Sequence, residues 1–159
     1  MSTLKIWLET KMALSREIMF SALLVLASLS IYLGLGTVFG YPFGWELLVR
    51  LTPYTAMIMV KNALGEEALF RLLPLLIFFA VVKDRKIAIV LFFIFSPLFA
   101  YLHIGLISLF VIGPISVLLT LAFLKFGGAT GNHLRGFMFV GAIHAVTNFS
   151  IHSCARFLA

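Results

Sequence analysis

The chain has 159 residues, of which 62% are hydrophobic and 11% are charged, and its formal net charge is +6. Soluble domains carry about one quarter charged residues, so this composition excludes a soluble protein and predicts a single integral membrane domain, all-α in class, over residues 1–159. The basic residues lie in short connections and form no stripe with interleaved aromatics, which argues against a nucleic-acid partner, and the single cysteine, Cys154, excludes an intramolecular disulfide and a Cys-rich metal site.

The first half of the chain predicts an amphipathic start and two membrane spans. Met1 to Glu17 mixes charged and apolar residues as an interfacial helix does. A first span follows over Ile18 to Gly40, close to the ~20 residues that a bilayer requires. Leu51 to Val60 is too short to span alone, so we expect a short re-entrant or interfacial helix within residues 46–60. It leads into a second span, which tolerates Pro74 and continues to Val82.

The second half predicts three further spans, over Ile87 to Ile104, Leu106 to Leu124 and Phe137 to Phe157. A polar loop from Lys125 to Arg135 separates the last two and contains His133, which we expect to be solvated. The predicted fold is therefore a polytopic membrane helix bundle of about five transmembrane helices, with an N-terminal interfacial helix and a short re-entrant or interfacial helix.

The basic residues predict the orientation of this bundle. With the N-terminus in the cytoplasm, only three basic residues outside the spans, Arg50, Lys61 and Arg156, lie on the outer side. The others lie inside: Lys5, Lys11, Arg16, Lys83, Arg85, Lys86, Lys125 and Arg135. Five spans then place the C-terminus outside, in a membrane that we expect to be the bacterial inner membrane.

One predicted span contains three ionisable side chains within six residues, Glu66, Glu67 and Arg71. Such groups are costly at membrane depth, so they need partners, a water-filled cavity or a function. On a helix, Glu67 and Arg71 stand at i and i+4 with the acid first, the favourable order for an ion pair. Glu66 lies about 100° from Glu67 around the helix, so we expect it to face a different neighbour and to remain free of that pair.

Two other predicted spans carry histidines at comparable heights. His103 ends the third span, and His144 and Asn148 lie one turn apart on the fifth. Glu66 and His103 each lie roughly 25 Å along their helices from the basic turn at residues 83–86, and Asn148 and His144 lie roughly 20 and 13 Å from Arg135. All four side chains are therefore expected to meet around one site in the half of the membrane away from the basic turns.

This set of side chains suits the hydrolysis of an amide. A carboxylate and an imidazole can share a water molecule and take its proton, while a second histidine and an asparagine donate hydrogen bonds to the developing oxyanion. Thr147 and Ser150 are poor candidates for a nucleophile, because such residues commonly hydrogen-bond within membrane helices. For His152, one turn beyond Asn148, packing is favoured over a place at the pocket rim or a role as metal ligand.

The three motifs, Glu-Glu-x-x-x-Arg at 66–71, Phe-x-x-x-His at 99–103 and His-x-x-x-Asn at 144–148, occur in order on separate predicted spans. Together they resemble the CPBP or Abi family of CAAX proteases and bacteriocin-processing membrane peptidases, over about residues 64–150. The resemblance implies a glutamic-type intramembrane endopeptidase in which Glu66 and His103 activate water. It further implies an oxyanion hole formed by His144 and Asn148, and supporting roles for Glu67, Arg71 and Phe99.

The resemblance leaves the cofactor and the substrate open. It implies a reaction without a cofactor, with zinc held by Glu66, His103 and His144 as the less favoured alternative. A membrane-anchored protein or peptide is the expected partner besides the lipid bilayer. The short chain and the outward-facing pocket favour a bacterial sorting peptidase of the JDVT-CTERM type, which removes a C-terminal anchor from an exported protein, over a CAAX-type peptidase acting on prenylated proteins.

Two classes without peptidase activity are weighed against this interpretation. One is a self-immunity protein against a peptide toxin, or a membrane scaffold that keeps a decayed site. The other is a proton or ion carrier, since intramembrane Glu and His often mark such pathways. Against the carrier, the polar residues gather in one half of the membrane and no polar stripe crosses from side to side.

Overall fold

The computed structural model describes residues 3–40 and 52–158, and all regular structure in these ranges is helical. The α-helices are α1 (Thr3–Glu9), α2 (Leu14–Val38), α4 (Pro53–Glu67), α5 (Leu73–Val81), α6 (Arg85–Ile104), α7 (Leu106–Phe126) and α8 (His133–Leu158). A π-helical segment (Ala68–Leu72) joins α4 to α5, and a 3-10 turn (Gly128–Thr130) follows α7. The predicted all-α bundle is confirmed.

Four of the described helices are long and apolar enough to cross a membrane, over Leu14–Val38, Arg85–His103, Leu106–Phe126 and His133–Cys154. This makes the chain an integral membrane protein. The remaining expected span, the second along the chain and the one that contains Glu66, is a helical run in three parts, formed by α4, the π-helical segment and α5. Neither α4 nor α5 alone reaches the length that a bilayer requires.

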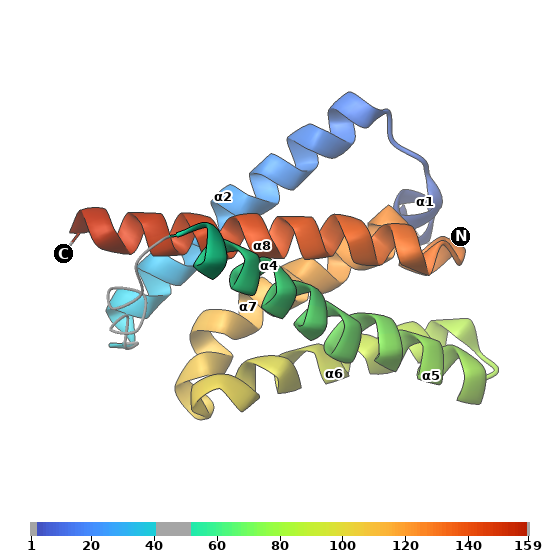
Figure 1. Ribbon diagram of the computed structural model, residues 1–159. Coiled ribbons are helices and arrows are strands. Elements are labelled where there is room, and N and C mark those ends of the chain that lie inside the picture. Colours follow the sequence, from blue (N-terminus) through green and yellow to red (C-terminus); the bar gives the residue numbers. More distant parts are fainter. Residues whose placement is uncertain (1–2, 41–51, 159) are drawn as a thin grey trace.

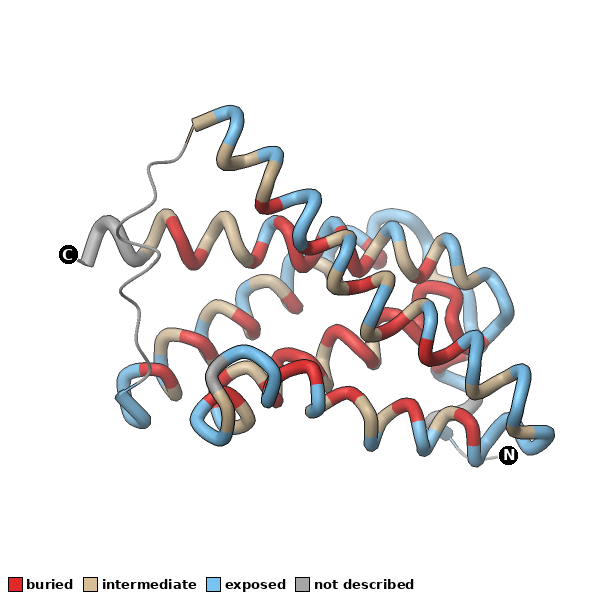
Figure 2. The backbone as a smooth tube through the Cα atoms, turned by 60° about the horizontal axis from the view of Figure 1, so that its bottom comes forward, coloured by how far each residue is buried: buried red, intermediate tan, exposed pale blue. Residues whose placement is uncertain are grey.

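Helix α8 lies in the middle of the bundle (Figure 1) and contacts α2, α4 and α7. Helix α6 packs against α7 on one side and α5 on the other, and α4 packs against α8. The helical run from α4 to α5 therefore connects α8 with α6. Along the helices, buried positions alternate with exposed ones (Figure 2), and among the described residues α7 contains the most buried positions. Many large apolar side chains face outward, as they would toward lipid.

Capping residues and glycines set several helix ends. The Thr52 and Thr55 side chains form a capping box at the start of α4, and the carboxylate of Asp84 accepts hydrogen bonds from backbone N–H groups that open α6. Gly105 separates α6 from α7 with a positive φ of 69°, a conformation that favours glycine. A Cβ atom at Gly136 would lie 2.8 Å from the Phe123 carbonyl oxygen, so α7 and α8 approach closely only because this residue is glycine.

Three predicted boundaries are wrong. Met1 to Glu17 is not one interfacial helix, because α1 ends at Glu9 and α2 begins at Leu14. Residues 53–60 form no separate re-entrant helix, because the capping box starts a helix that runs directly to Glu67; residues 46–51 lie outside the described residues. His133 is the first residue of α8 rather than part of a solvated loop.

The π-helical segment has a local cause in the sequence. The backbone N–H of Leu73 donates to the carbonyl of Ala68, five residues earlier, so this turn is wider than a regular one. Pro74 follows directly, has no N–H to donate, and its ring would clash with the carbonyl of Phe70 in a regular helix. The wider turn accommodates the proline without breaking the helix.

The N-terminal helix is fixed to one end of the bundle. The ammonium group of Lys125, at the end of α7, donates hydrogen bonds to the carbonyls of Trp7 and Thr10 and lies 4.7 Å from the Trp7 ring centroid. At the same end, Arg135 of α8 forms an ion pair with the buried Glu17 of α2, at 2.5 Å. Lys125 therefore ties α1 to the end of α7, and Arg135 ties α8 to α2 at the same end.

The basic turn between α5 and α6 lies at this end as well. The Arg85 guanidinium lies 5.2 Å from the Phe79 ring, which contacts the ring of His133 at the start of α8. The basic residues of two connections, α5–α6 and α7–α8, thus gather at a single end of the molecule, beside α1. This end is called the basic end below.

Candidate active site

An ion pair inside the bundle joins Glu67 to Arg71, one helical turn apart. The Arg71 guanidinium donates to Oε1 of Glu67 at 2.5 Å, and the two side chains are only 1% and 0% exposed. The predicted i, i+4 pair is therefore present. The second carboxylate oxygen of Glu67, Oε2, and the Nε of Arg71 have no hydrogen-bond partner among the described residues.

The same guanidinium is also held from α7. Its second terminal nitrogen donates to the hydroxyl of Ser116 at 3.0 Å and to the Ser116 carbonyl at 3.4 Å. Ser116 bonds in turn to Ser96 of α6 at 2.9 Å, and Ser96 bonds to Thr120 at 2.8 Å. This buried network (Glu67, Arg71, Ser96, Ser116 and Thr120) ties the Glu67 turn to α6 and α7.

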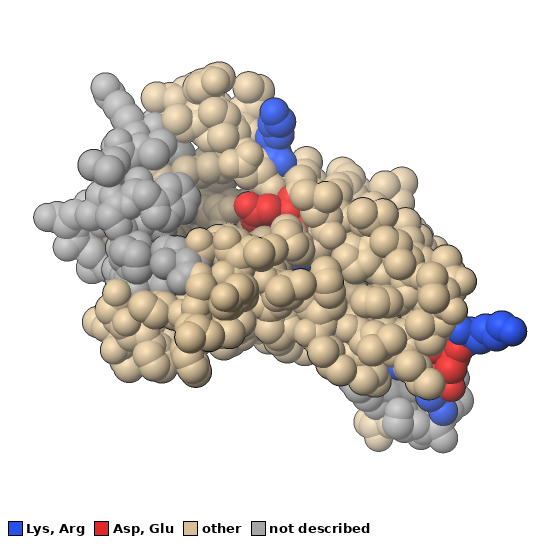
Figure 3. Space-filling view, turned by 90° about the horizontal axis from the view of Figure 1, so that it is seen from below, with Lys and Arg blue, Asp and Glu red and all other residues tan. Residues whose placement is uncertain are grey.

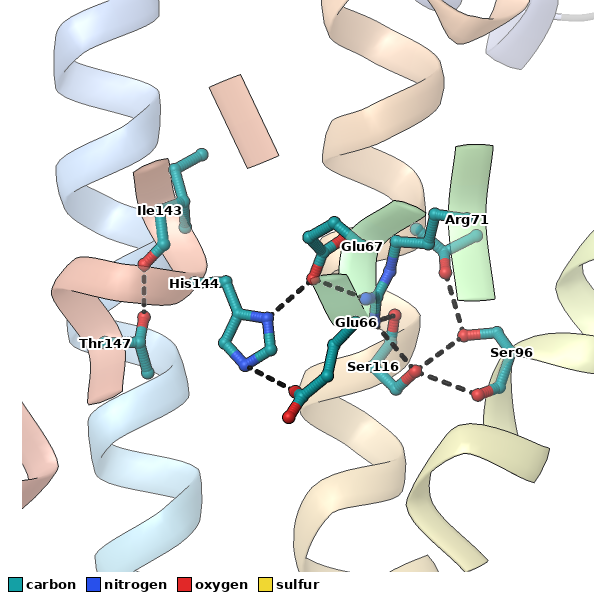
Figure 4. Close-up of polar contacts among 9 residues, drawn as sticks. Glu66, Glu67, Arg71, Ser96, Ser116, Ile143, His144 and Thr147 are labelled. Carbon is teal, nitrogen blue, oxygen red and sulfur yellow. Dashed lines mark hydrogen bonds and ion pairs between the residues drawn. The ribbon is translucent and has the colours of Figure 1, made fainter. Parts of the chain in front are cut away.

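The imidazole of His144 lies between the two neighbouring carboxylates, Glu66 and Glu67 (Figure 4). Its Nδ1 is 2.7 Å from Oε1 of Glu67, and its Nε2 is 3.5 Å from Oε2 of Glu66. The expectation that Glu66 faces a different neighbour from Glu67 is therefore wrong. Two side chains about 100° apart around the helix axis can contact opposite nitrogens of a single ring that lies between them.

The bond to Glu67 fixes the position of one hydrogen on His144 and leaves the position of a second one open. The carboxylate of Glu67 can only accept, so Nδ1 of His144 carries the hydrogen of that bond. A hydrogen bond between Nε2 and Glu66 then needs a second hydrogen, either on Nε2 or on the Glu66 carboxyl group. At 3.5 Å, Nε2 and the Glu66 carboxylate form an ion pair when both nitrogens of His144 carry a hydrogen.

A cavity of about 370 Å³ adjoins this ring, within the size range of small-ligand sites. All four predicted site residues line it: Glu66, His103, His144 and Asn148. Glu66 is 32% exposed. The other lining residues come from α2, the first two-thirds of α7 and the parts of α4, α6 and α8 away from the basic end. The four side chains therefore meet in the predicted half of the bundle.

One face of the protein shows a hollow that contains a charged group. Seen from below, an acidic side chain of the described residues lies in this hollow beside a basic one, and a second group of charged atoms lies at the lower right of the view (Figure 3). A second, smaller pocket of about 210 Å³ is lined by Glu66 and His103 together with Phe70, Phe99 and Leu102. Glu66 and His103 thus share two adjoining spaces.

Phe99 forms a wall between the buried network and the cavity. Its ring is 4.6 Å from the ring of His103 and 6.2 Å from that of His144, edge-to-face in both cases. The Arg71 guanidinium lies 5.2 Å from the same ring. Because Nδ1 of His103 bonds to the Phe99 carbonyl at 3.0 Å, the chemistry of His103 falls to Nε2.

The remaining polar residues of α8 divide into two groups. Thr147 and Ser150 donate to carbonyls of their own helix, at Ile143 and Val146, which confirms the prediction that they hydrogen-bond within the helix. His152 lines the cavity, which places it at the pocket and not only in the packing. His133 contacts Phe79 and its Nδ1 is buried without a partner.

The zinc alternative finds no support in the positions of these side chains. In residues 3–40 and 52–158, no three His, Cys, Asp or Glu side chains are grouped as a metal ion requires. Glu66, His103 and His144 line one cavity but form no such cluster, and Nδ1 of His144 is held by Glu67. No step of the chemistry below is therefore assigned to a metal.

Sequence reasoning missed Ser96, Ser116 and Thr120, which look like ordinary small polar residues of membrane helices. The signal that points to them is the donor count of Arg71: a guanidinium has five N–H groups and a single carboxylate accepts at most two of them in parallel. A buried arginine therefore requires further acceptors on neighbouring helices. Comparison with protein-family models, with curated proteins and with solved structures finds no match for this chain.

Proposed function

We propose that this protein is an intramembrane endopeptidase of the glutamic type, which hydrolyses a peptide bond in a membrane-anchored substrate. One observation carries the proposal: the Glu66 carboxylate lies 3.5 Å from His144 at the wall of a cavity that His103 and Asn148 also line. A carboxylate, two imidazoles and a carboxamide around one cavity are the groups that activation of water and stabilisation of an oxyanion require.

In the proposed reaction, Glu66 acts with His103 as the general base. A water molecule between them loses a proton to the carboxylate while its oxygen bonds to the carbonyl carbon of the substrate. The carbonyl electrons move onto the oxygen, where the Asn148 carboxamide and Nε2–H of His144 donate hydrogen bonds to the oxyanion. When the oxyanion collapses, the C–N bond breaks and the proton held by Glu66 passes to the leaving amine.

Glu67 is proposed to act through His144 rather than on the substrate. Its bond to Nδ1 fixes the orientation of the imidazole and stabilises the imidazolium, the form that has a hydrogen on Nε2 to donate, as a carboxylate does behind a catalytic histidine. Arg71 and Ser116 hold Glu67 in turn. In this assignment, Glu67 is a positioning residue and Glu66 is the reacting carboxylate.

The proposed substrate is an exported protein with a C-terminal apolar anchor, cut near the outer side of the bacterial inner membrane. The basic end contains residues of α1, of the α5–α6 turn and of the α7–α8 connection, and cytoplasmic ends of membrane proteins are rich in Lys and Arg. The cavity lies in the other half of the bundle. Placing the N-terminus in the cytoplasm therefore opens the cavity toward the outer half of the membrane.

The test compares new protein termini in cells that express the wild-type chain or Glu66→Gln. Mass spectrometry of membrane fractions should find cleaved C-terminal anchors with the wild type and none with the variant. Asp84→Asn is the matched control: it makes the same acid-to-amide change outside the cavity and keeps a good N-cap, so cleavage should continue. Equal cleavage by Glu66→Gln and wild type would contradict the mechanism.

A further inference from the structure

His152 is a polar group in the cavity that the chemistry above does not use. Its side chain is 1% exposed and lines the cavity, and neither ring nitrogen has a hydrogen-bond partner among the described residues. Leaving such groups unpaired in a buried site is costly, so native proteins pair them with water or a ligand. His152 therefore indicates that something polar enters this part of the cavity.

The spacing along α8 indicates the shape of that ligand. His144, Asn148 and His152 follow one another at intervals of four residues, and all three line the cavity. Four residues rise about 6 Å, so His152 lies about 12 Å from His144 along the helix. An extended peptide advances about 3.3 Å per residue and turns alternate backbone groups to the same side about 6.6 Å apart. The polar row on α8 thus nearly matches every second residue of an extended chain.

An extended peptide inside a membrane needs such a row. Its N–H and C=O groups lose the partners they had in a helix, and each unpaired group is costly away from water. The cavity wall otherwise contains many apolar side chains, including Ile112, Ile115 and Leu119, which offer no hydrogen bond. An imidazole has one donor and one acceptor when neutral, so it can pair with either backbone group.

We propose that His152 is a substrate-binding residue that hydrogen-bonds the main chain of the extended peptide at about the fourth residue from the cleaved bond. The contact recognises a backbone amide irrespective of its side chain, and it sets the distance between the bound end of the peptide and the bond that is cut. The inference rests on the proposed function, because it takes Glu66 and His144 as the point of cleavage.

The test uses peptidyl difluoroketones, whose hydrates imitate the adduct of water with a peptide carbonyl. Leucine-based members carry one to six residues on either side of the ketone, and their affinities for the full detergent-solubilised chain are measured by calorimetry. On one side of the ketone, adding the fourth residue should tighten binding to the wild type in a step of about tenfold, which is about 1.4 kcal/mol. His152→Phe should lose this step, His152→Gln should keep part of it, and short members should bind all three alike.

A second arm uses the wild-type chain alone, so it does not depend on whether a variant folds. Replacing the fourth-residue amide by an ester removes an N–H and weakens the carbonyl as an acceptor, and it should abolish the step. The same ester at the third residue should leave it. A series that binds without a step, or with a step that His152→Phe and the ester leave intact, overturns the inference. If no member binds more tightly to the wild type than to Glu66→Gln, the proposed function itself fails.

Discussion

Glu66 and Glu67 are adjacent in the chain but have opposite surroundings. Glu67 is fully buried and bonds to Arg71 and His144 on one oxygen, whereas Glu66 is 32% exposed and contacts the same imidazole at 3.5 Å. A buried carboxylate that is bonded to both an arginine and a histidine cannot move without breaking those bonds. The contrast supports the proposed division of roles, in which Glu67 fixes the His144 ring and Glu66 is the reacting carboxylate.

The sharpest test of this contrast is Glu66→Gln, which should separate activity from stability. Loss of the general base should lower the cleavage rate about 10²–10⁴-fold, while the free energy of unfolding changes by less than about 0.5 kcal/mol because the side chain is half-exposed. Single-turnover cleavage in proteoliposomes and thermal unfolding in detergent measure the two quantities. A large loss of stability would place Glu66 with the buried network instead.

Arg71→Met should do the reverse and act mainly on stability. It leaves the Glu67 carboxylate buried without its cation, which costs about 3–5 kcal/mol when one partner of a buried pair is removed. Denaturant or thermal unfolding of the detergent-solubilised chain measures the loss. The matched control is the double variant Glu67→Gln/Arg71→Met, which has no unpaired charge and should recover part of the stability. A double variant no more stable than Arg71→Met would show that the pair is not coupled.

Ser116→Ala should have an intermediate effect, because it removes an acceptor of Arg71 and a partner of Ser96. Buried groups left without a partner cost about 1–3 kcal/mol, and the guanidinium keeps only the Ser116 carbonyl at 3.4 Å on that nitrogen. The same unfolding experiment measures the change. Cleavage by the folded fraction should fall as well, since the network positions Glu67 behind His144.

Ser150→Ala should have the smallest effect and calibrates the series. The Ser150 hydroxyl donates only to the Val146 carbonyl of its own helix, which remains in the helical hydrogen-bond pattern without it. The free energy of unfolding and the activation free energy of cleavage should both stay within about 0.5 kcal/mol of the wild-type values. An effect as large as that of Ser116→Ala would mean that hydroxyl loss in these helices is costly irrespective of the network.

The sequence predicted the all-α bundle because apolar segments of span length leave few alternatives in a membrane. It also predicted that Glu66, His103, His144 and Asn148 lie around one space, since helical rise alone sets their heights. The ion pair of Glu67 and Arg71 followed from their spacing. These successes depend on regular helices, for which distance along the chain becomes distance along an axis.

The errors arose where side-chain length or local capping decides the outcome. An angle around the helix axis gives the direction of the Cβ atom but not where a long side chain ends. It therefore did not reveal that both glutamates reach the His144 ring of α8. The start of α4 depends on two threonine hydroxyls, whereas the apolar pattern suggested a separate helix up to Val60. Whether the ring nitrogens of His152 have hydrogen-bond partners depends on which residues of other helices face them, and a single sequence does not show this.

The widened turn at Ala68–Leu72 gives the site an unusual vulnerability. This turn contains one residue more than a regular helical turn between the two carboxylates and α5. One residue corresponds to about 100° of rotation around the helix axis. Shortening that turn by a single residue would restore an ordinary helix and swing Glu66 and Glu67 away from α8 while leaving every polar side chain in the protein. The register of this helix, as much as its chemistry, is therefore a condition for the two acids to meet one imidazole.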